Sequence, residues 1–529
     1  MPETNPSTSW KPKYNPWLIA PVVALAAFME VLDTSIANVA LPHISGSLGA
    51  SEEQGTWVLT TYLVANAIVL PISGWITSIV GRKRFFLICI GLFTASSVLC
   101  GIAWSLPILL VARTLQGIGG GGLQPMAQSI LADVFPPEKR GLAFSVYGLT
   151  VVVAPALGPT LGGWITDSYS WHWIFLINLP VGLLASGLVF RLVEDPPFLV
   201  RRKLGESRFD YLGFSALALG VAALQIALDK GQEDDWLGSH FILTLVIVAV
   251  LCLSFLIIWE WFEKDPIVDV KIFKHFTFAT STTMMFLIGM VYFSSMVLMP
   301  QFLQNLMGYT AEDAGLVVSF GAALLLVEMP IVGVLTGKYP AKYLMAFGWL
   351  TLSAGLYFSV KLVDLDIGFG TAAFIMVMQT LPLAFLFIPS TTAAYIGVPQ
   401  EKSGSVAGLI NFARNIGSSV GTSLATTILA RRIQVHQERL SAHTALGDHN
   451  FQSAVNHIAH SLQLQSGVGK ADAHKGALAQ FYQAMQGQAA VLSYMDTYCL
   501  LAAAAGAMFL LAFVLRKNNP KMTEQHAGH

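Results

Sequence analysis

Charged residues are scarce in this 529-residue sequence, at 12%, whereas hydrophobic residues make up 54%. A soluble globular protein carries roughly 25% charged residues, because its surface must be solvated. Half of that charge density excludes a soluble single domain, a disordered chain and a nucleic-acid-binding protein. The charges that are present nearly cancel, to a formal net charge of −1, so no overall field points to an acidic or basic partner.

Cysteine is also rare, and nucleotide-binding motifs are lacking. The four cysteines, Cys89, Cys100, Cys252 and Cys499, lie within apolar segments and show neither a disulfide framework nor the spacing of zinc ligands. The sequence contains no Walker A motif, so ATP is not expected as an energy source. We therefore expect no metal and no cofactor.

Two glycine motifs have the pattern of enzyme signatures but lie inside apolar segments. The run from Gly117 to Gly122 fits G-x-G-x-x-G, which binds dinucleotides only after a strand. The run from Gly417 to Gly421 fits G-x-S-x-G, which needs a strand-to-helix turn to act as a nucleophile elbow. Small residues inside a membrane helix more often permit close helix packing. The sequence gives no support for an enzyme.

Long apolar blocks replace the missing charges. A run of about 18 or more apolar residues can cross the ~30 Å hydrocarbon core as a helix. Continuous blocks of this length exclude a membrane β-barrel, whose strands are short and alternating. We predict 14 spans: 17–39, 56–79, 85–104, 107–131, 142–166, 172–193, 211–229, 240–262, 277–300, 314–336, 342–362, 368–395, 404–430 and 491–515. The twelfth can also be interpreted as broken at Pro382 and Pro389.

Lysine and arginine orient these spans. With the N-terminus inside, the inner segments hold 21 of the 30 Lys and Arg residues, and the outer segments hold seven. Cytoplasmic loops carry the excess of positive charge in membrane proteins. We therefore expect both termini in the cytoplasm, in agreement with an even number of spans.

The apolar blocks predict an all-α polytopic membrane protein. We predict two six-helix bundles with an inserted helix pair, and parallel repeats of this kind occur in transporters. The predicted segments are a cytoplasmic tail at 1–16, an N-terminal bundle at 17–193, a cytoplasmic linker at 194–210, the inserted pair at 211–262, a C-terminal bundle at 277–515 and a second cytoplasmic tail at 516–529.

Residues 432–490 form the one large segment predicted outside the membrane on the far side. It is polar, and apolar residues at helical spacing predict one or two amphipathic helices within it. His457 and His460 have an HisxxHis spacing that could bind a metal. We favour a solvated helix face, because no further ligand spacing completes a site.

Three charged residues are placed deep in the N-terminal spans. Glu30 and Asp33 share one face of the first span, and Asp33 and Arg113 lie at similar depth when residues are counted from the span ends. Ionisable groups at such depth cost about 2.5–3.5 kcal/mol on insertion scales, so each one suggests a function. Burial disfavours an ionised carboxylate and a nearby Arg favours it, so the site could exchange protons. We favour proton coupling through Asp33, before Glu30, over a static ion pair.

The C-terminal spans hold two deep charges, Glu328 and Arg414. Glu328 could attract cations or bind a second proton, and it could equally be neutralised by Arg414. Asn411, Gln379 and Tyr292 are further candidates for a substrate cavity, although each is more often an interhelical hydrogen bond. Met- and Phe-rich stretches such as TTMMFLIGMVYF suit an adaptable apolar pocket, and lipid contact explains them equally well.

Several motifs together resemble the 14-span drug:proton antiporters of the major facilitator superfamily. LDTSIANVALP at 32–42 resembles the signature of their first span, and RTLQGIGGG from Arg113 resembles the motif of the fourth, whose Arg is implicated in proton transfer. GWITSIVGRKR resembles the gating-loop motif, with Ser78 at its usually acidic position, which puts the usual gating salt bridge in doubt. APALGPTLGG at 154–163 resembles the antiporter motif of the fifth span. The matching positions are Gly74, Gly81, Arg82 and Lys83 of the gating loop, and Pro155, Gly158, Pro159, Gly162 and Gly163 of the antiporter motif.

Other stretches, such as WHWIFLINLPVG from Trp171, are similar to the EmrB-type subgroup. The resemblance implies export of hydrophobic toxic compounds, driven by the proton gradient, from a bacterial inner membrane. It also implies a periplasmic EmrA-type adaptor and an outer-membrane channel as partners, with 432–490 as the expected adaptor contact. The alternative is a proton-linked carrier for a metabolite, lipid or fatty acid on the same fold. A membrane sensor is disfavoured, because no soluble domain is present to bind a signal.

Overall fold

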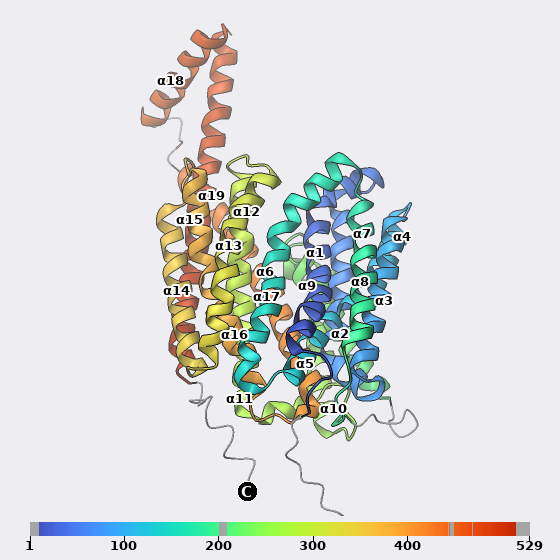
Figure 1. Cartoon of the computed structure of the whole chain (residues 1–529). Coiled ribbons are helices and arrows are strands. Elements are labelled where there is room, and N and C mark those ends of the chain that lie inside the picture. Colours follow the sequence, from blue (N-terminus) through green and yellow to red (C-terminus); the bar gives the residue numbers. More distant parts are fainter. Residues whose placement is uncertain (1–9, 200–208, 443, 445–448, 468, 515–529) are drawn as a thin grey trace, which may run out of the picture.

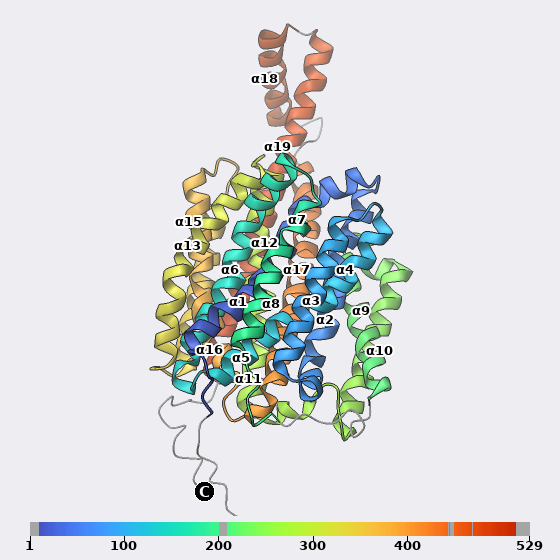
Figure 2. The same cartoon turned by 45° about the vertical axis from the view of Figure 1, so that its right-hand side comes forward.

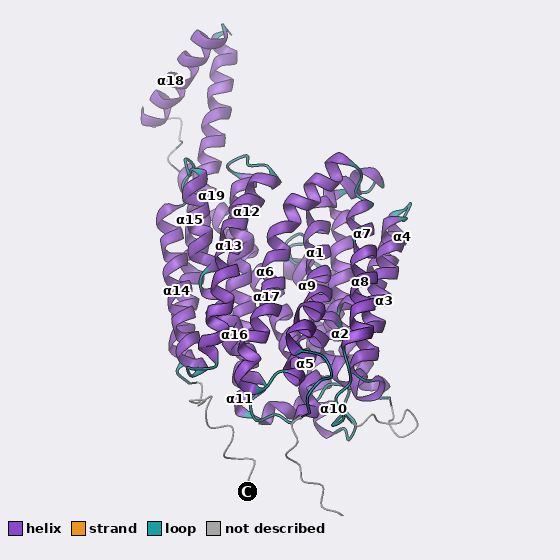
Figure 3. Cartoon of the chain, viewed as in Figure 1, coloured by secondary structure: helices purple, strands orange, loops and turns teal. Residues whose placement is uncertain are grey.

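The computed structural model describes residues 10–199, 209–442, 444, 449–467 and 469–514, and every regular element within these ranges is a helix (Figure 3). The predicted tail at 516–529 lies outside the described residues, as do most of the tail at 1–16 and half of the linker at 194–210. The all-α class predicted from the apolar blocks is confirmed.

The N-terminal half contains eight helices that form six membrane-crossing segments. The first begins where the Asn15 side chain accepts a hydrogen bond from the backbone of Trp17, at 3.0 Å, and the second begins with a capping box between Ser51 and Gln54. The helices are α1 (Pro16–Ser47), α2 (Glu52–Val80), α3 (Arg82–Gly101), α4 (Leu106–Gly120), α5 (Leu123–Val134), α6 (Pro137–Ser168), α7 (Trp173–Leu176) and α8 (Asn178–Leu192).

An inserted pair and the C-terminal half follow. The inserted pair is α9 (Tyr211–Lys230) and α10 (His240–Phe262), joined through the short η1 (Trp236–Gly238). The later elements are η2 (Val270–Lys274), α11 (Phe276–Ile288), the π-helical η3 (Gly289–Phe293), α12 (Ser294–Asn305), α13 (Ala311–Thr336), α14 (Ala341–Leu362), α15 (Phe369–Thr380), α16 (Pro382–Ala394), η4 (Gln400–Lys402), α17 (Ser403–Ser441), α18 (His449–Ser466) and α19 (Lys470–Ala512).

The predicted 14 spans are confirmed. Thirteen helical segments in the described ranges are both long and apolar enough to cross a membrane. The fourteenth is α17, which is long enough at 39 residues but is rich in Gly, Ser and Thr. It can be less apolar because it packs among α2, α5, α11 and α19 inside the molecule.

Four of the described spans are divided into shorter helices, and two of these divisions lie at helix-breaking residues. The fourth is divided into α4 and α5 at Gly121–Gly122, and the twelfth is divided into α15 and α16 immediately before Pro382. Pro389, the other suggested break point, lies within α16. Proline has no backbone N–H, and the first residue of a helix makes no intrahelical hydrogen bond through that group. A new helix can therefore begin at Pro382.

The helices form two side-by-side groups in Figure 1, with α1–α8 on one side and α12–α16 and α19 on the other. Helix α17 packs against α11 and α19 and belongs to the second group. The two groups meet where α6 packs against α13 and where α2 and α5 pack against α17. The inserted pair lies outside this core, where α9 packs against α2 and also contacts α17 (Figure 2).

The segment 432–490 is more helical than expected of a loop. Helix α17 continues to Ser441 and α19 begins at Lys470, so both run well beyond the predicted span boundaries. The amphipathic α18 packs against the start of α19 through Val455, Ala459, Ala473 and Ala477. This α18–α19 hairpin projects from the helix core at the end opposite to the start of α1 and the end of α19 (Figures 1 and 2).

Candidate functional site

Asp33 and Arg113, predicted at equal depth, are in direct contact. Arg113 on α4 donates from Nη1 to Oδ2 of Asp33 on α1 at 2.6 Å, and both side chains are fully buried. Neither charge is left uncompensated, as a buried ion pair requires. The structure thus brings the two residues together, and their role in proton coupling stays a prediction.

Two amides that the sequence reasoning missed complete this pair. Gln116 donates to Oδ1 of Asp33 at 2.9 Å and accepts from Arg113 at 2.7 Å, and Asn178 on α8 donates to the same Oδ1 at 2.7 Å. Gln116 lies one helical turn after Arg113, so its position on the same face could have identified it. Asn178 lies far away in the sequence and gave no such signal.

The guanidinium of Arg113 is also held by its surroundings in the N-terminal half. Its Nε donates to the carbonyl oxygen of Val58 at 3.1 Å, and its centre lies 4.3 Å from the ring centroid of Tyr62 and 5.4 Å from that of Phe175. Aromatic faces attract cations at such distances. The guanidinium therefore contacts α2 and α7 in addition to Asp33 on α1.

Glu30, one turn before Asp33, has its own set of donors and does not contact Arg113. Its Oε1 accepts from the hydroxyl of Tyr62 and from Asn66 Nδ2, both at 3.1 Å. Its Oε2 accepts from Nε2 of Gln124 on α5 at 2.5 Å. All three donors are neutral, so the carboxylate could gain a proton without an ion pair being broken.

Arg414 contacts the N-terminal half instead of Glu328. Its Nη2 donates to Oε1 of Gln124, which also accepts the hydroxyl of Tyr147 at 2.9 Å. The guanidinium lies 5.9 Å from the ring centroid of Phe387. Its Nη1 is buried and has no hydrogen-bond partner among the described residues. Of the two interpretations of Glu328, its neutralisation by Arg414 is not found among the described residues, because Arg414 donates to Gln124 on α5 instead.

Glu328 on α13 is a half-buried side chain whose two carboxylate oxygens are both buried. Neither oxygen has a hydrogen-bond partner in the described part of the chain. Buried polar atoms are normally satisfied, and each exception calls for an explanation. Either a cation or a bound proton, the two ligands considered above for Glu328, would supply a missing partner.

The other three predicted cavity residues have different environments. Asn411 donates to Gln128 at 2.8 Å and so joins α17 to α5, whereas Gln379 donates to Ser359 at 2.8 Å and joins α15 to α14. Tyr292 is buried on η3. For Asn411 and Gln379 the structure shows the interhelical hydrogen bonds that were the alternative interpretation.

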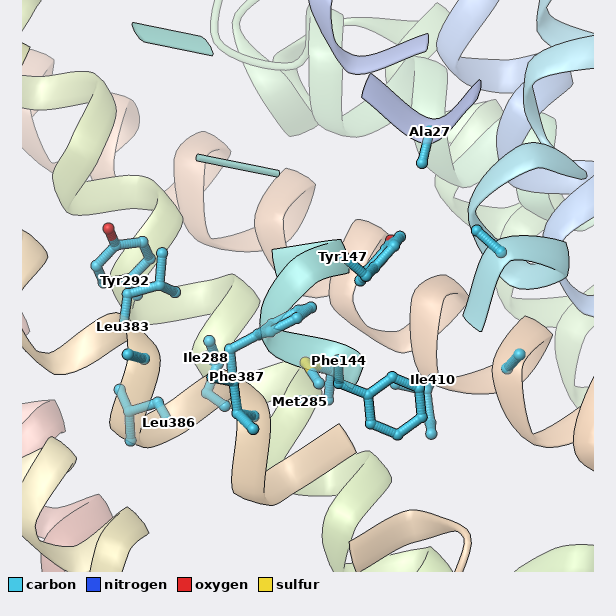
Figure 4. Close-up of a cluster of buried hydrophobic side chains, with 14 of the residues drawn as sticks. Ala27, Phe144, Tyr147, Met285, Ile288, Tyr292, Leu383, Leu386, Phe387 and Ile410 are labelled. Atoms are coloured by element: carbon cyan, nitrogen blue, oxygen red, sulfur yellow. The ribbon is translucent and has the colours of Figure 1, made fainter. Parts of the chain in front are cut away.

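Aromatic and Met side chains fill the region between the two groups of helices. Tyr147 and Phe387 stack with ring centroids 6.2 Å apart, and Phe144 stacks on Tyr395 at 5.5 Å. Figure 4 shows Tyr147 and Phe144 of α6 beside Phe387 of α16, with Met285 close by. Such side chains form an apolar surface that adapts to ligand shape.

The gating loop has a buried salt bridge, although Ser78 occupies its usual acidic position. Gly81 has φ 93°, a conformation that favours glycine, and lies between α2 and α3. Arg82 forms an ion pair with Asp133 at the end of α5, and both side chains are almost fully buried. Asp133 was missed by the sequence reasoning, because it lies outside the motif.

The same loop region ties the two groups of helices together. Arg82 donates from Nη2 to the carbonyl oxygen of Gln400 at 3.0 Å, and Ser403 donates to Asp133 at 3.0 Å. Gly74 lies so close to Ser405 that an added Cβ would come within 2.3 Å of its Oγ. Lys83 bonds within its own half, to Asp195 and to the carbonyl oxygen of Phe190.

The antiporter motif lies on α6 between its two neighbours. A Cβ on Gly158 would lie 2.0 Å from Oγ of Ser35 on α1, and one on Gly162 would lie 3.2 Å from Ile36. Pro155 accepts a hydrogen bond from Ser35 through its carbonyl oxygen, at 3.3 Å. Pro159 contacts the opposite side, where Gly315 of α13 approaches its ring. Gly163 has open space where a Cβ would be.

No group of three or more metal-ligating side chains occurs among the residues that the structure describes. His457 and His460 are exposed on the outer face of α18, in agreement with the solvated face favoured above.

Comparisons with known proteins agree with the motifs. The sequence profile described as Major Facilitator Superfamily matches residues 23–422. The chain is 38% identical over 419 residues to Multidrug export protein EmrB of Escherichia coli K12, covering 79% of this chain and 81% of that protein. It is 39% identical over 425 residues to Fatty acid resistance protein FarB of Neisseria gonorrhoeae, covering 80% of this chain and 82% of that protein. Among solved structures, the proton:xylose symporter XylE superposes with a TM-score of 0.61 at 14% identity. The superposition covers 96% of this chain and 97% of the symporter chain.

Proposed function

Because this chain belongs to the major facilitator superfamily, we propose that it exports hydrophobic drugs in exchange for protons by alternating access. The observation that carries the proposal is the fully buried pair of Asp33 and Arg113, with Glu30 one turn away. Ionisable groups at this depth are expensive in a membrane protein and mark proton or substrate pathways. Relatives named as multidrug export proteins supply the substrate class.

The chemistry follows from the two carboxylates. Oδ2 of Asp33 accepts a hydrogen bond from Arg113, so a proton binds at this oxygen only after the ion pair has opened. Glu30 is bonded to neutral donors and can be protonated in place. Exchange of drug for proton requires that these events alternate with access to each side of the membrane.

The function is tested with the full-length protein in liposomes that carry an interior pH indicator. Addition of a hydrophobic cation such as ethidium to the side from which it is exported should drive protons in the opposite direction. A matched set of neutral and anionic hydrophobic compounds defines the charge preference. Ethidium movement without any proton movement would contradict the proposal.

A second function is favoured by one relative. The Neisseria gonorrhoeae protein is named for fatty acid resistance and is as similar to this chain as the drug exporter is. A carrier of fatty acids or other lipids would use the same proton site with an anionic substrate. In the liposome assay it would respond to a long-chain fatty acid and not to ethidium.

We assign the protein to a bacterial inner membrane, with both termini in the cytoplasm, because lysine and arginine are concentrated on that side. The α18–α19 hairpin then projects into the periplasm, since it lies at the opposite end (Figure 1). It is the proposed contact for an EmrA-type adaptor, which would connect the protein to an outer-membrane channel.

Deletion of the hairpin separates the two roles. Removal of residues 449–482 takes away α18 and the part of α19 that packs on it, far from Asp33 and Arg113. We expect transport in liposomes to stay within twofold of the unaltered protein, and drug resistance in cells to fall to the level of cells without the protein. Equal loss in both assays would show instead that the hairpin supports the fold.

A further inference from the structure

A single amide, Gln124, joins the buried carboxylate of one half to the buried arginine of the other. Its Nε2 lies 2.5 Å from Glu30 on α1, and its Oε1 accepts from Arg414 on α17 and from Tyr147 on α6. Glu30 is 4% exposed and Arg414 is 9% exposed, so these bonds lie in the interior. Neither the gating loop nor the antiporter motif contains this residue.

Chemistry fixes the orientation of this amide. A guanidinium has only donors, so the atom of Gln124 that faces Arg414 must be the oxygen. The NH2 group then points to Glu30, which accepts hydrogen bonds when it is ionised. Carboxylate, amide and guanidinium therefore form a chain in which each donor faces an acceptor.

Protonation of Glu30 breaks this match. A protonated Oε2 becomes a donor and needs an acceptor, and Gln124 is the partner that Oε2 has among the described residues. We propose that Gln124 is a positioning residue, which turns its amide over when Glu30 is protonated and thereby releases Arg414. After the turn, the NH2 group faces a guanidinium that cannot accept a hydrogen bond.

The release has a consequence for alternating access. Gln124 lies on α5 and Arg414 on α17, so their bond joins the two groups of helices. Its loss makes separation of the two halves less costly while the proton is bound. The proton state of one half is in this way transmitted to the other, which is the coupling that antiport needs.

The titratable and charged side chains near Glu30 lie on four helices. Asp33 lies on the same helix, Tyr62 faces Glu30 from α2, and Tyr147 and Arg414 face it from α6 and α17. Tyr62 bonds to Oε1, so Tyr62→Phe leaves the bond from Oε2 to Gln124 in place. Because Tyr62→Phe removes one donor from Glu30, we expect it to shift the midpoint of the pH response without abolishing the response.

Gln128 supplies a matched control. It lies one turn after Gln124 on α5 and also bonds across to α17, at Asn411, with Nδ2 of Asn411 2.8 Å from its Oε1. It contacts no carboxylate in the described structure. Gln128→Met therefore removes a similar bond between the halves and leaves the bond between Gln124 and Glu30 in place, although Gln128 also neighbours Tyr147.

The experiment rests on the proposed function and uses ethidium as the probe, with the full-length protein in liposomes. Exchange of ethidium without a pH gradient reports binding and alternation, and accumulation driven by a pH gradient reports coupling. For Gln124→Met we expect exchange within twofold of normal, and driven accumulation reduced roughly tenfold, within the range of known couplings between sites. Ethidium affinity should also lose its pH dependence in this variant.

Gln128→Met should keep both the driven accumulation and the pH profile. The inference fails if Gln124→Met keeps a normal pH profile, or if the two variants lose coupling equally, which would indicate a packing role. Should Gln124→Met fail to fold, Gln124→Asn retains the amide on a shorter side chain, and its pH profile must then be flattened. Absence of proton-driven ethidium transport by the unaltered protein would instead overturn the proposed function.

Discussion

The two halves of the molecule treat their buried carboxylates differently. In the N-terminal half, Asp33 and Glu30 each accept three hydrogen bonds from neighbouring side chains. In the C-terminal half, Glu328 accepts none from the described residues, although both of its oxygens are buried. Among the described residues, the same functional group therefore has several hydrogen-bond donors in the N-terminal half and none in the C-terminal half.

This difference indicates a division of labour. A carboxylate surrounded by fixed donors is held in one place, which suits a proton site that must work with every substrate. A buried carboxylate without donors carries a desolvation cost of about 1–3 kcal/mol or more, and a ligand that bonds to it removes that cost. These environments fit our proposal that the N-terminal half holds the proton site, and they lead us to propose that Glu328 contacts the cargo.

The largest effect should follow from removal of the charge of Asp33 in the N-terminal half. Asp33→Asn keeps the shape of the side chain but leaves Arg113 without its counter-charge and removes one of the two carboxylates that we propose to exchange protons. We expect drug-dependent proton movement in liposomes to fall to the background of empty liposomes, while the protein still inserts into the membrane and purifies as a single species. Persistent drug-dependent pH changes would show that Asp33 is dispensable, and would remove the basis of the comparison.

A smaller effect, selective for cationic substrates, should follow from a change at Glu328 in the C-terminal half. Glu328→Gln removes the charge but no hydrogen bond within the described structure. We expect transport of divalent hydrophobic cations to decrease about tenfold, the effect of about 1.4 kcal/mol of lost attraction, and transport of neutral compounds to stay within twofold. The measurement is a set of initial transport rates for compounds matched in size. A uniform decrease for all compounds would place Glu328 with the proton machinery of the other half.

The fold was largely predictable from the sequence, for physical reasons. Blocks of 18 or more apolar residues leave little choice of structure in a bilayer, so the 14 spans were found even where α17 is comparatively polar. The helical course of 432–490 was underestimated, because polar residues give no hydropathy signal for a helix that stands in water. The packing of α18 on α19 depends on the small apolar surface of Val455 and Ala477.

The site was predictable only along single helices. Asp33 and Arg113 could be matched by depth, because a helix converts residue number into height. Partners on distant segments could not be predicted, because nothing in the sequence shows which helix faces pack against each other. Thus Asn178 and Asp133 were missed, and Arg414 was considered as a partner for Glu328 although it bonds to Gln124.

The smallest predicted effect concerns α6, which lies between the two halves and carries two glycines with different surroundings. A methyl group on Gly158 would lie 2.0 Å from Oγ and 2.5 Å from Cβ of Ser35, whereas one on Gly163 would meet nothing within 4 Å. Ser35 is too short to turn away, so the α1–α6 contact must widen in Gly158→Ala, at a cost of about 1–3 kcal/mol. Thermal unfolding of the purified protein should show a lower midpoint for Gly158→Ala and an unchanged one for Gly163→Ala. Because α6 also packs on α13, the Gly158 variant should slow ethidium transport in liposomes as well. Equal behaviour of the two variants would show that close packing on α1 is not what the motif requires.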